Sequence, residues 1–190
     1  MNTSYLFLAT GFEEIEALTV VDVMRRAGMD VKTISITGNL IVRGAHGIPV
    51  EADALYEKTD FITPEWLILP GGMPGATNLS EYAPLNSMLK VQAQAGKIAA
   101  ICAAPAVVLG PLGILEGKEA TCYPGFEKGM TGAVQRDAPV IALDRLITAN
   151  GPSAAQRFAL AIVANSMGES VAQEVGSAML FYPKRVNFYF

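Results

Sequence analysis

The sequence predicts a doubly wound α/β fold, in which helices cover both faces of a mostly parallel sheet. Two observations lead to this fold class. Short apolar runs rich in β-branched residues alternate along the chain with longer segments of helical periodicity. The apolar runs also lack the polar alternation of a half-exposed strand, which indicates burial on both faces of a parallel sheet. We therefore expect ligands to bind beyond the carboxyl ends of the strands.

In the first half of the chain, glycines and prolines separate the predicted elements. An apolar run at residues 5–10 predicts the first strand. Helical spacing at 13–27 ends at Gly28, a residue type common just after a helix. The β-branched run at 31–37 predicts a second strand. Residues 41–51 contain two glycines and a proline, which indicates a hairpin or a loop.

The second half continues the alternation. The apolar runs 66–69 and 97–102 predict buried strands, and between them an amphipathic helix at 84–95 closes at Gly96. Residues 104–109 are expected to be helical. Short strands and two final helices are predicted in the remainder, at residues 119–123, 140–144, 145–149, 154–167 and 170–180.

The composition agrees with a single apolar-cored domain, which we place at residues 1–183, followed by a tail at 184–190 whose role the sequence leaves open. The 190 residues are 51% hydrophobic and 17% charged, and the net charge is −4. This excludes a disordered chain and offers no basic surface for nucleic acid. The apolar runs are too short for a membrane span, and the first residues do not resemble a signal peptide. We expect a cytoplasmic protein with free thiols.

Cys102 is the strongest candidate for chemistry. It lies where a buried strand must turn into a helix, and Ala103 and Ala104 permit a tight bend of the nucleophile-elbow type. Amides at the start of the helix would favour a thiolate and lower the pKa of the thiol. The alternative is that Cys102 is a small packed residue, as most free cysteines are. Its position alone leaves both interpretations open.

Glu16 favours the functional interpretation. On a helical wheel of residues 13–27 it falls at the margin of the apolar face. Burial there would raise its pKa, so that a neutral Glu16 could donate a hydrogen bond to a nearby anion. The alternative is that acidic residues of a first turn complement the helix N-terminus, which explains Glu13 and Glu14 better than Glu16.

Other positions carry weaker signals. Gly71 and Gly72 end a buried strand, and their amides could approach an anion, although such a segment alone indicates only a turn. Ile15 and Leu18 lie on the polar side of the helical wheel, which is either scattered exposure or part of a subunit interface. His46, the single histidine, is expected to be solvated in its loop. The spacing of cysteines and histidine predicts no metal site, and we expect no cofactor.

Four segments together resemble the DJ-1/ThiJ/PfpI superfamily, and within it the DJ-1 branch that includes the bacterial YajL-type proteins. They are GFEEIEALTVVDVMRRAG, LPGGMPGATNL, AAICAAPAVVL and NGPSAAQRFALAIV, and they span residues 4–167. The resemblance implies a flavodoxin-like fold similar to class I glutamine amidotransferases. It also implies a nucleophile at Cys102, a protonated glutamate at Glu16, and oxyanion donors at the backbone amides of Gly72 and Ala103.

The same resemblance implies a homodimer whose first helix contributes to the interface, which suits an outward Ile15 and Leu18. Three departures from the family pattern stand out, at Tyr123, His46 and Ser153. Tyr123 replaces a histidine often found near the nucleophile, and His46 replaces an arginine in a loop that reaches across the dimer. We therefore hypothesise that His46 lies near the partner subunit's Cys102.

Further pocket candidates are expected around the nucleophile. Ser153 follows Pro152 where the family has a glycine, so it could alter the pocket wall. With these two residues we group Gly71, His46 and Tyr123. Cys122 is expected to be a packed strand residue, with a resolving thiol as the alternative.

The resemblance implies cofactor-independent cysteine chemistry on methylglyoxal, glyoxal or their early glycation adducts, of the glyoxalase III or deglycase type. The alternative is a redox sensor or oxidative-stress chaperone without significant turnover. A thiamine (thiazole monophosphate) biosynthesis role is less favoured because no Walker-type phosphate loop is present. An intracellular peptidase is also less favoured, because Ala103 stands where peptidase members have histidine.

Overall fold

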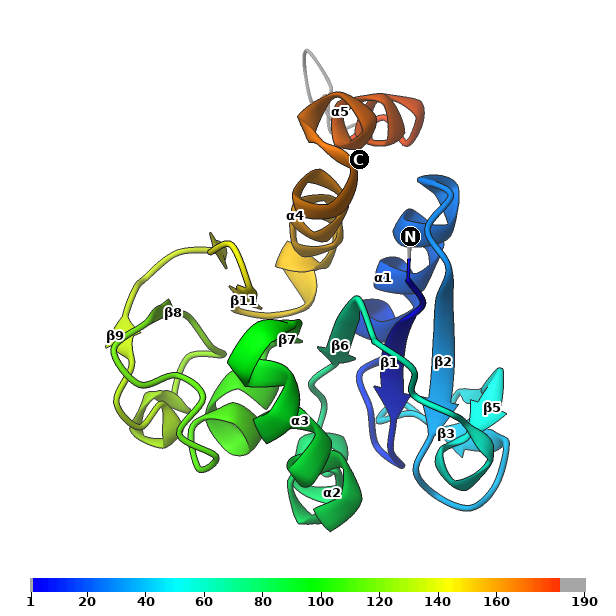
Figure 1. Ribbon diagram of the computed structural model, residues 1–190, viewed down its shortest axis with the longest axis vertical. Coiled ribbons are helices and arrows are strands. Elements are labelled where there is room, and N and C mark those ends of the chain that lie inside the picture. Colours follow the sequence, from blue (N-terminus) through cyan, green and yellow to red (C-terminus); the bar gives the residue numbers. More distant parts are fainter. Residues whose placement is uncertain (1, 182–190) are drawn as a thin grey trace, which may run out of the picture.

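The computed structural model describes residues 2–181 and contains a central seven-stranded sheet (Figure 1). Its strands are β1 (Ser4–Leu8), β2 (Val31–Ser35), β5 (Ala54–Leu55), β6 (Trp66–Leu69), β7 (Lys97–Ile101), β10 (Val140–Ala142) and β11 (Leu146–Ala149). Their order in the sheet is β10-β11-β7-β6-β1-β2-β5. All neighbours are parallel except β10, which is antiparallel to β11. This arrangement confirms the predicted α/β, flavodoxin-like class.

Two short ladders and five α-helices also belong to the described fold, together with one π-helical and three 3₁₀ turns. The ladders pair β3 (Ile41–Arg43) with β4 (Pro49–Glu51), and β8 (Glu119–Ala120) with β9 (Val134–Gln135). The helices are α1 (Glu14–Arg26), α2 (Gly75–Glu81), α3 (Ala83–Ala95), α4 (Ala155–Met167) and α5 (Glu169–Ala178). No helix within residues 2–181 is both long and apolar enough to cross a membrane.

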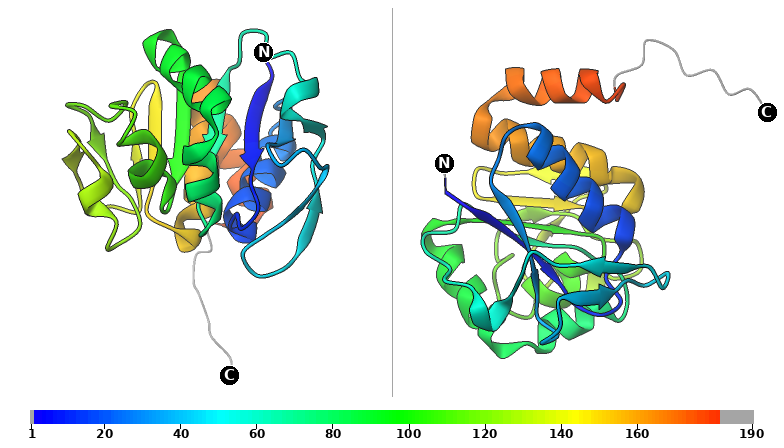
Figure 2. Two further views of the ribbon diagram at one scale, coloured as in Figure 1. Left: turned by 90° about the horizontal axis from the view of Figure 1, so that it is seen from below. Right: turned by 90° about the vertical axis from the view of Figure 1, so that its right-hand side faces the viewer.

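The helices form a layer on each side of the sheet (Figure 2). The packing of β1 shows why both faces are apolar. Leu6 and Leu8 belong to a core cluster shared with α1 and α4, whereas Phe7 belongs to a second cluster shared with α3. Successive side chains of a strand point to opposite faces, so burial on both sides requires an uninterrupted apolar run. The helix α5 packs against α4, outside the first layer.

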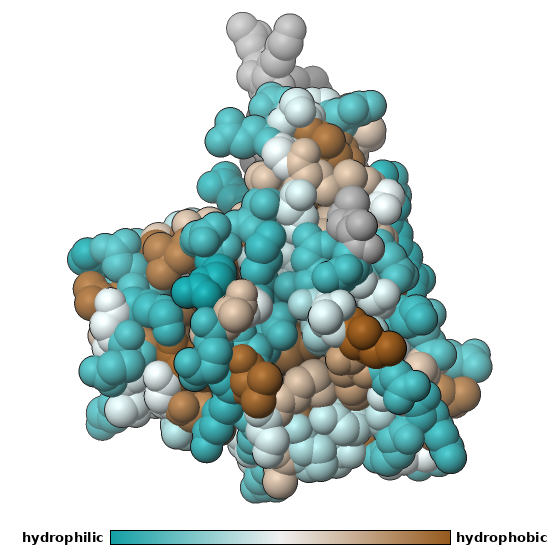
Figure 3. Space-filling view, in the orientation of Figure 1, coloured by the Kyte–Doolittle hydropathy of each residue, from teal (hydrophilic) through white to brown (hydrophobic). Residues whose placement is uncertain are grey.

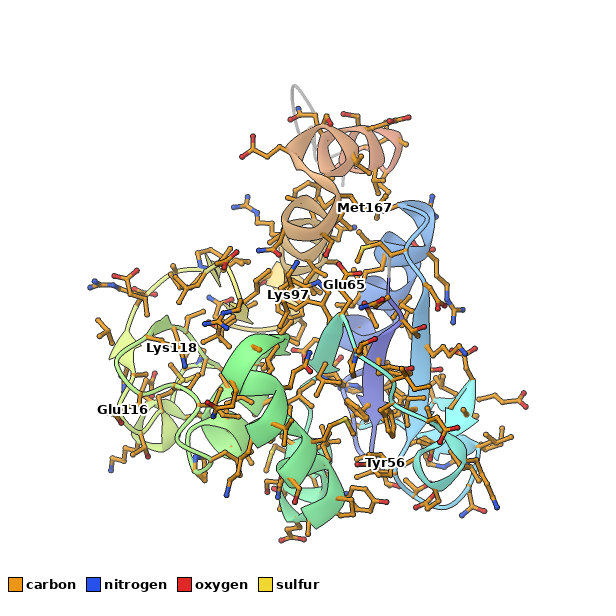
Figure 4. The ribbon with its side chains drawn as sticks, viewed as in Figure 1. Tyr56, Glu65, Lys97, Glu116, Lys118 and Met167 are labelled. Atoms are coloured by element: carbon orange, nitrogen blue, oxygen red, sulfur yellow. The ribbon has the colours of Figure 1, made fainter. Side chains whose placement is uncertain are left out.

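The amino ends and the carboxyl ends of the parallel strands carry different kinds of residues. At the amino ends of β6 and β7, Figure 4 labels Glu65 and Lys97, and the Lys97 ammonium lies 5.4 Å from the centroid of the Trp66 ring. The carboxyl ends carry the turns that follow β1, β6, β7 and β11, which are four neighbouring strands. On the face of the molecule seen in Figure 3, apolar side chains are scattered among hydrophilic ones.

Most predicted elements are confirmed within a few residues, and the exceptions have local causes. The segment expected to be helical at 104–109 is helical, but as a π-helical turn, Pro105–Leu109, in which the Gly110 N–H donates to the Pro105 carbonyl at 2.9 Å. Helix α2 was not predicted, because GATNLSE combines a helix-breaking glycine with four polar residues in seven. The tail at 184–190 lies outside the described residues.

Candidate active site

Cys102 stands at a bend held by backbone hydrogen bonds on both sides. Strand β7 ends at Ile101, and Cys102 then adopts a φ of +63°, in the left-handed region that costs a side chain about 1–3 kcal/mol. Its N–H donates to the Ala149 carbonyl at the end of β11, and its carbonyl accepts from the Tyr123 N–H, both at 2.8 Å. These contacts offset the strain and produce the elbow that the sequence predicts.

Two backbone amides face the sulfur from different turns. The N–H groups of Gly72, after β6, and of Ala103, after β7, both donate to the Cys102 thiol group. Strands β6 and β7 are parallel neighbours, so their carboxyl ends bring these turns together. The amides predicted as oxyanion donors therefore converge on one point beside the nucleophile candidate.

Glu16 reaches the same point from α1. Its side chain is fully buried, and its Oε2 accepts a hydrogen bond from the Gly71 N–H at 2.7 Å. Its Oε1 is buried without a hydrogen-bond partner among the described residues. Burial is the main cause that raises the pKa of Glu16 to about 7, and the charge of Glu13 adds to it, while hydrogen bonds with Gly71 and Cys102 oppose the rise. The carboxyl group therefore changes charge near neutral pH.

The pKa of Cys102 corrects one expectation from the sequence. Burial first, and then the charge of Glu16, raise the pKa of the thiol to about 12, although the Gly72 and Ala103 amides lower it. The amides act in the expected direction, but desolvation and the neighbouring carboxylate outweigh them. A proton on Glu16 removes that repulsion, so the carboxyl and thiol titrate as one coupled pair.

Gly71 separates the two groups, and only a glycine fits there. A Cβ at this position would lie 2.6 Å from Cys102 Cβ and 2.8 Å from Glu16 Oε2. These separations are far shorter than ordinary van der Waals contacts between such atoms. The absence of a side chain at Gly71 is what allows Glu16 to reach Cys102.

A side chain at Gly72 would also clash with its neighbours, and Gly28 offers a matched control for replacing this glycine. Gly72 and Gly28 both have a positive φ, +87° and +79°, but a Cβ at Gly72 would meet the Glu13 backbone nitrogen at 2.4 Å, whereas Gly28 faces open space. We expect Gly28→Ala to lower the free energy of unfolding by about 1 kcal/mol, and Gly72→Ala by about 3 kcal/mol or more. Urea denaturation measures both, and equal losses would show that the close backbone approach is unimportant.

His46 is exposed but not simply solvated, which corrects the expectation for this loop. Its Nδ1 lies 2.9 Å from Glu14 Oε2, and its backbone N–H donates to Glu14 Oε1 at 2.9 Å. Glu14 is correspondingly buried, so it does more than complement the helix N-terminus. Because residues 14 and 46 are far apart in the sequence, no local pattern could have indicated this pair. The proximity of His46 to the partner subunit's Cys102 stays a prediction.

The remaining pocket candidates lie around the elbow. The Tyr123 side chain is 44% exposed, and its ring would be 3.2 Å from a Cβ built at Gly151. Pro152 and Ser153 belong to the short turn Pro152–Ala154 before α4, and Ser153 is exposed. Tyr123 is thus joined to the Cys102 backbone by a hydrogen bond and to the turn after β11 by packing.

The two interface candidates project outward. Ile15 and Leu18, on α1, are 56% and 41% exposed. Ile48, in the loop attached to Glu14, is also exposed, at 52%. Its N–H donates to Glu14 at 3.4 Å, which places this third apolar side chain near the start of α1.

Cys122 packs in a different core cluster from Cys102. It is 7% exposed and packs in the cluster that contains Phe7, whereas Cys102 packs in the cluster that contains Leu6 and Leu8. Burial raises the pKa of its thiol to about 11. These properties favour a packed residue over a resolving thiol.

Known proteins are similar to this chain in sequence and in fold. A family model described as the DJ-1/PfpI family matches residues 3–165. The zebrafish (Danio rerio) Parkinson disease protein 7 homolog is 37% identical, over 92% of this chain and 95% of its own length. A Caenorhabditis elegans protein named glutathione-independent glyoxalase DJR-1.2 is 36% identical, over 80% of this chain and 81% of its own length. The chain spans 41% and 47% of the length of two Arabidopsis thaliana DJ-1 homologs that it also matches.

The solved structures agree. Oxidized Toxoplasma gondii DJ-1 superimposes with a TM-score of 0.91 at 35% identity, covering 95% of this chain and 98% of that one. The family model covers most of the chain, and full-length relatives exceed 30% identity. The chain belongs to the DJ-1/PfpI family.

Proposed function

We propose that this chain is a cofactor-independent enzyme that converts methylglyoxal or glyoxal, or their early glycation adducts, through a Cys102 nucleophile. The observation that carries the proposal is the convergence of the Glu16 carboxyl and two backbone amides on one buried sulfur. A C. elegans relative is named a glutathione-independent glyoxalase, which agrees with this choice of substrate.

The pair of pKa values suggests how the proton moves. Near neutral pH an ionised Glu16 accepts the proton of Cys102 while Sγ forms a bond to the aldehyde carbon. The Gly72 and Ala103 amides hold the oxyanion of the hemithioacetal that results. Glu16 then returns the proton to that oxyanion. A group that first accepts and then donates a proton needs a pKa near the working pH, and the pKa of Glu16 is about 7.

The overall conversion needs no external oxidant. Methylglyoxal and water become lactate, because the aldehyde carbon is oxidised while the adjacent ketone carbon is reduced. Isomerisation of the hemithioacetal to a thioester, followed by hydrolysis of the C–S bond, frees Cys102. The test is lactate formation from methylglyoxal by the purified protein without added thiol. A protein that forms no lactate, although Cys102 is alkylated readily, would contradict the proposed enzyme.

A second candidate function is a sensor of oxidants without significant turnover. It is favoured by the hydrogen-bonding groups around the sulfur, since two amides and a neutral Glu16 would stabilise the oxygens of a Cys102 sulfinate. The structural neighbour described as oxidized T. gondii DJ-1 is consistent with it.

We expect mild peroxide to add two oxygen atoms to Cys102 and none to Cys122. The selectivity comes from the oxidised product, because the Gly72 and Ala103 amides that would stabilise it lie beside Cys102. Burial raises the pKa of both thiols, to about 12 for Cys102 and about 11 for Cys122, so the pKa values do not favour oxidation of Cys102. Peptide mass spectrometry locates the added mass. Equal oxidation of both thiols, or oxidation confined to Cys122, would contradict a selective sensor.

We also propose a homodimer that uses the outward side of α1. The exposed side chains of Ile15, Leu18 and Ile48 support this, because clustered apolar residues on a surface favour association. The buried Glu14 holds the loop that carries Ile48 against α1. Cytoplasmic location stays a prediction.

A further inference from the structure

One histidine and two buried carboxylates fasten the loop between β3 and β4 to the start of α1. The His46 ring nitrogen Nδ1 lies 2.9 Å from Glu14 Oε2 and 3.5 Å from Glu13 Oε2. The Glu13 and Glu14 side chains are only 10% and 6% exposed, whereas the imidazole side chain is 68% exposed. The loop is further joined to this end of the helix by the Ala45 N–H, which donates to the Phe12 carbonyl at 2.8 Å.

The charges around His46 favour its protonated form. A hydrogen bond with Glu14, followed by the charges of Glu13 and Glu14, raises the pKa of His46 above its ordinary value of 6.5. The other charged side chain at this loop, Arg43 at the end of β3, donates to the Gly47 carbonyl instead of the carboxylates. His46 is therefore the titrating countercharge of Glu13 and Glu14.

These carboxylates also affect the candidate active site. Glu13 precedes Glu16 by one helical turn, and its negative charge raises the pKa of Glu16. The Glu13 N–H donates to the Gly71 carbonyl, and the Gly71 N–H donates to Glu16, so the three residues form one connected unit. A positive charge on His46 offsets the field of Glu13 at Glu16, and a neutral imidazole does not.

We propose that His46 is a positioning residue that transmits pH to the Glu16–Cys102 pair through Glu13 and Glu14. The inference rests on the proposed coupling of Glu16 and Cys102. When the pH rises through the pKa of His46, the imidazolium loses its proton and the negative field at Glu16 grows. Glu16 then keeps its own proton to a higher pH, and the pair loses its first proton later. A permanently charged residue at position 46 removes this response.

The experiment measures alkylation of Cys102 by iodoacetamide in the full chain, from about pH 5 to pH 9. A Cys122→Ala background leaves one reporting thiol. We compare wild type with His46→Arg, which is always charged, and His46→Gln, which is never charged. We expect the midpoint of the pH profile to be lowest in the arginine variant and highest in the glutamine variant. The difference should be about half a pH unit, or about threefold in rate on the rising limb.

Two control experiments test whether the effect of His46 on the midpoint passes through Glu13 and Glu14. Arg43→Gln removes a charge from the same loop without touching the carboxylates, and it should leave the midpoint unchanged; a shift as large as that of His46→Gln would overturn the proposal. In a Glu13→Gln, Glu14→Gln background, His46→Gln should leave the midpoint of the pH profile unchanged. An undiminished shift of the midpoint in that background would contradict the inference and would indicate direct contact of His46 with the partner subunit's Cys102. Equal midpoints for His46→Arg and His46→Gln would also contradict the inference.

Alkylation of Cys102 tests the role of His46 independently of the proposed enzyme activity. Alkylation does not require aldehyde turnover, so a protein that forms no lactate but shows the expected ordering of midpoints would refute the enzyme and support the role of His46. A protein that forms lactate with identical midpoints in all three forms would do the reverse.

Discussion

Replacing Cys102 with alanine is expected to lower methylglyoxal turnover roughly a thousandfold or more, to the rate without protein. The reason is that the described residues bring no other nucleophile to the point where the Gly72 and Ala103 amides meet the Glu16 carboxyl. Lactate formation followed over time measures the loss. Cys102→Ser, which keeps a weaker nucleophile at the same bend, should retain at most a small residual rate.

Cys122 offers a matched control for this experiment. It is the other cysteine, about equally buried, and it packs in a different core cluster. Cys122→Ala should therefore keep most of the turnover. Full activity in Cys102→Ala would contradict covalent catalysis by this sulfur, and a loss of activity in both variants would indicate that the packing of the domain had failed instead.

Replacing Glu16 with glutamine is expected to lower turnover by about two to four orders of magnitude. Glutamine keeps the shape but accepts no proton from Cys102. The wild-type rate should rise with pH through about 7, where Glu16 loses its proton, and this limb should be absent in Glu16→Gln. Glu16→Asp, which keeps the carboxyl on a shorter side chain, should retain the limb with a lower rate.

Stability measurements distinguish a catalytic loss from an unfolded protein. Because the pKa of Glu16 rises from 4.5 to about 7 on folding, the folded state binds the proton more tightly, and stability falls as the pH rises through this range. Above pH 7, Glu16→Gln avoids burying a charge and should be more stable than wild type, by on the order of 1–3 kcal/mol. A variant that is both inactive and less stable than wild type at pH 8 would contradict this account.

The fold could be predicted from the sequence because its signals are local. An apolar run such as 66–69 is buried on both faces wherever its strand lies in the sheet, and Gly28 marks the end of α1 through its own positive φ. The two-residue strand β5 was missed, because two residues carry no periodicity. Apolar spacing over a single turn also does not separate an α-helix from the π-helical turn after Cys102.

The candidate site was predictable only in part. Cys102 and Glu16 could be selected because each stands where its residue type is unusual, one at a bend and one on an apolar face. The high pKa of Cys102 could not be predicted, since it comes from burial and from a carboxylate carried by another element. The contact between Glu14 and His46 likewise depends on how the hairpin β3–β4 folds back onto α1.

The packing of the two cysteines in different core clusters has a consequence for the repair of an oxidised Cys102. Cys122 is buried and packs in a different cluster from Cys102, so we expect it not to capture a sulfenic acid formed on Cys102. Any return to the thiol must therefore draw on a reductant from outside the domain. If the chain is the proposed oxidant sensor, a shortage of such thiols would let Cys102 proceed to the sulfinate, which the molecule could not reverse by itself.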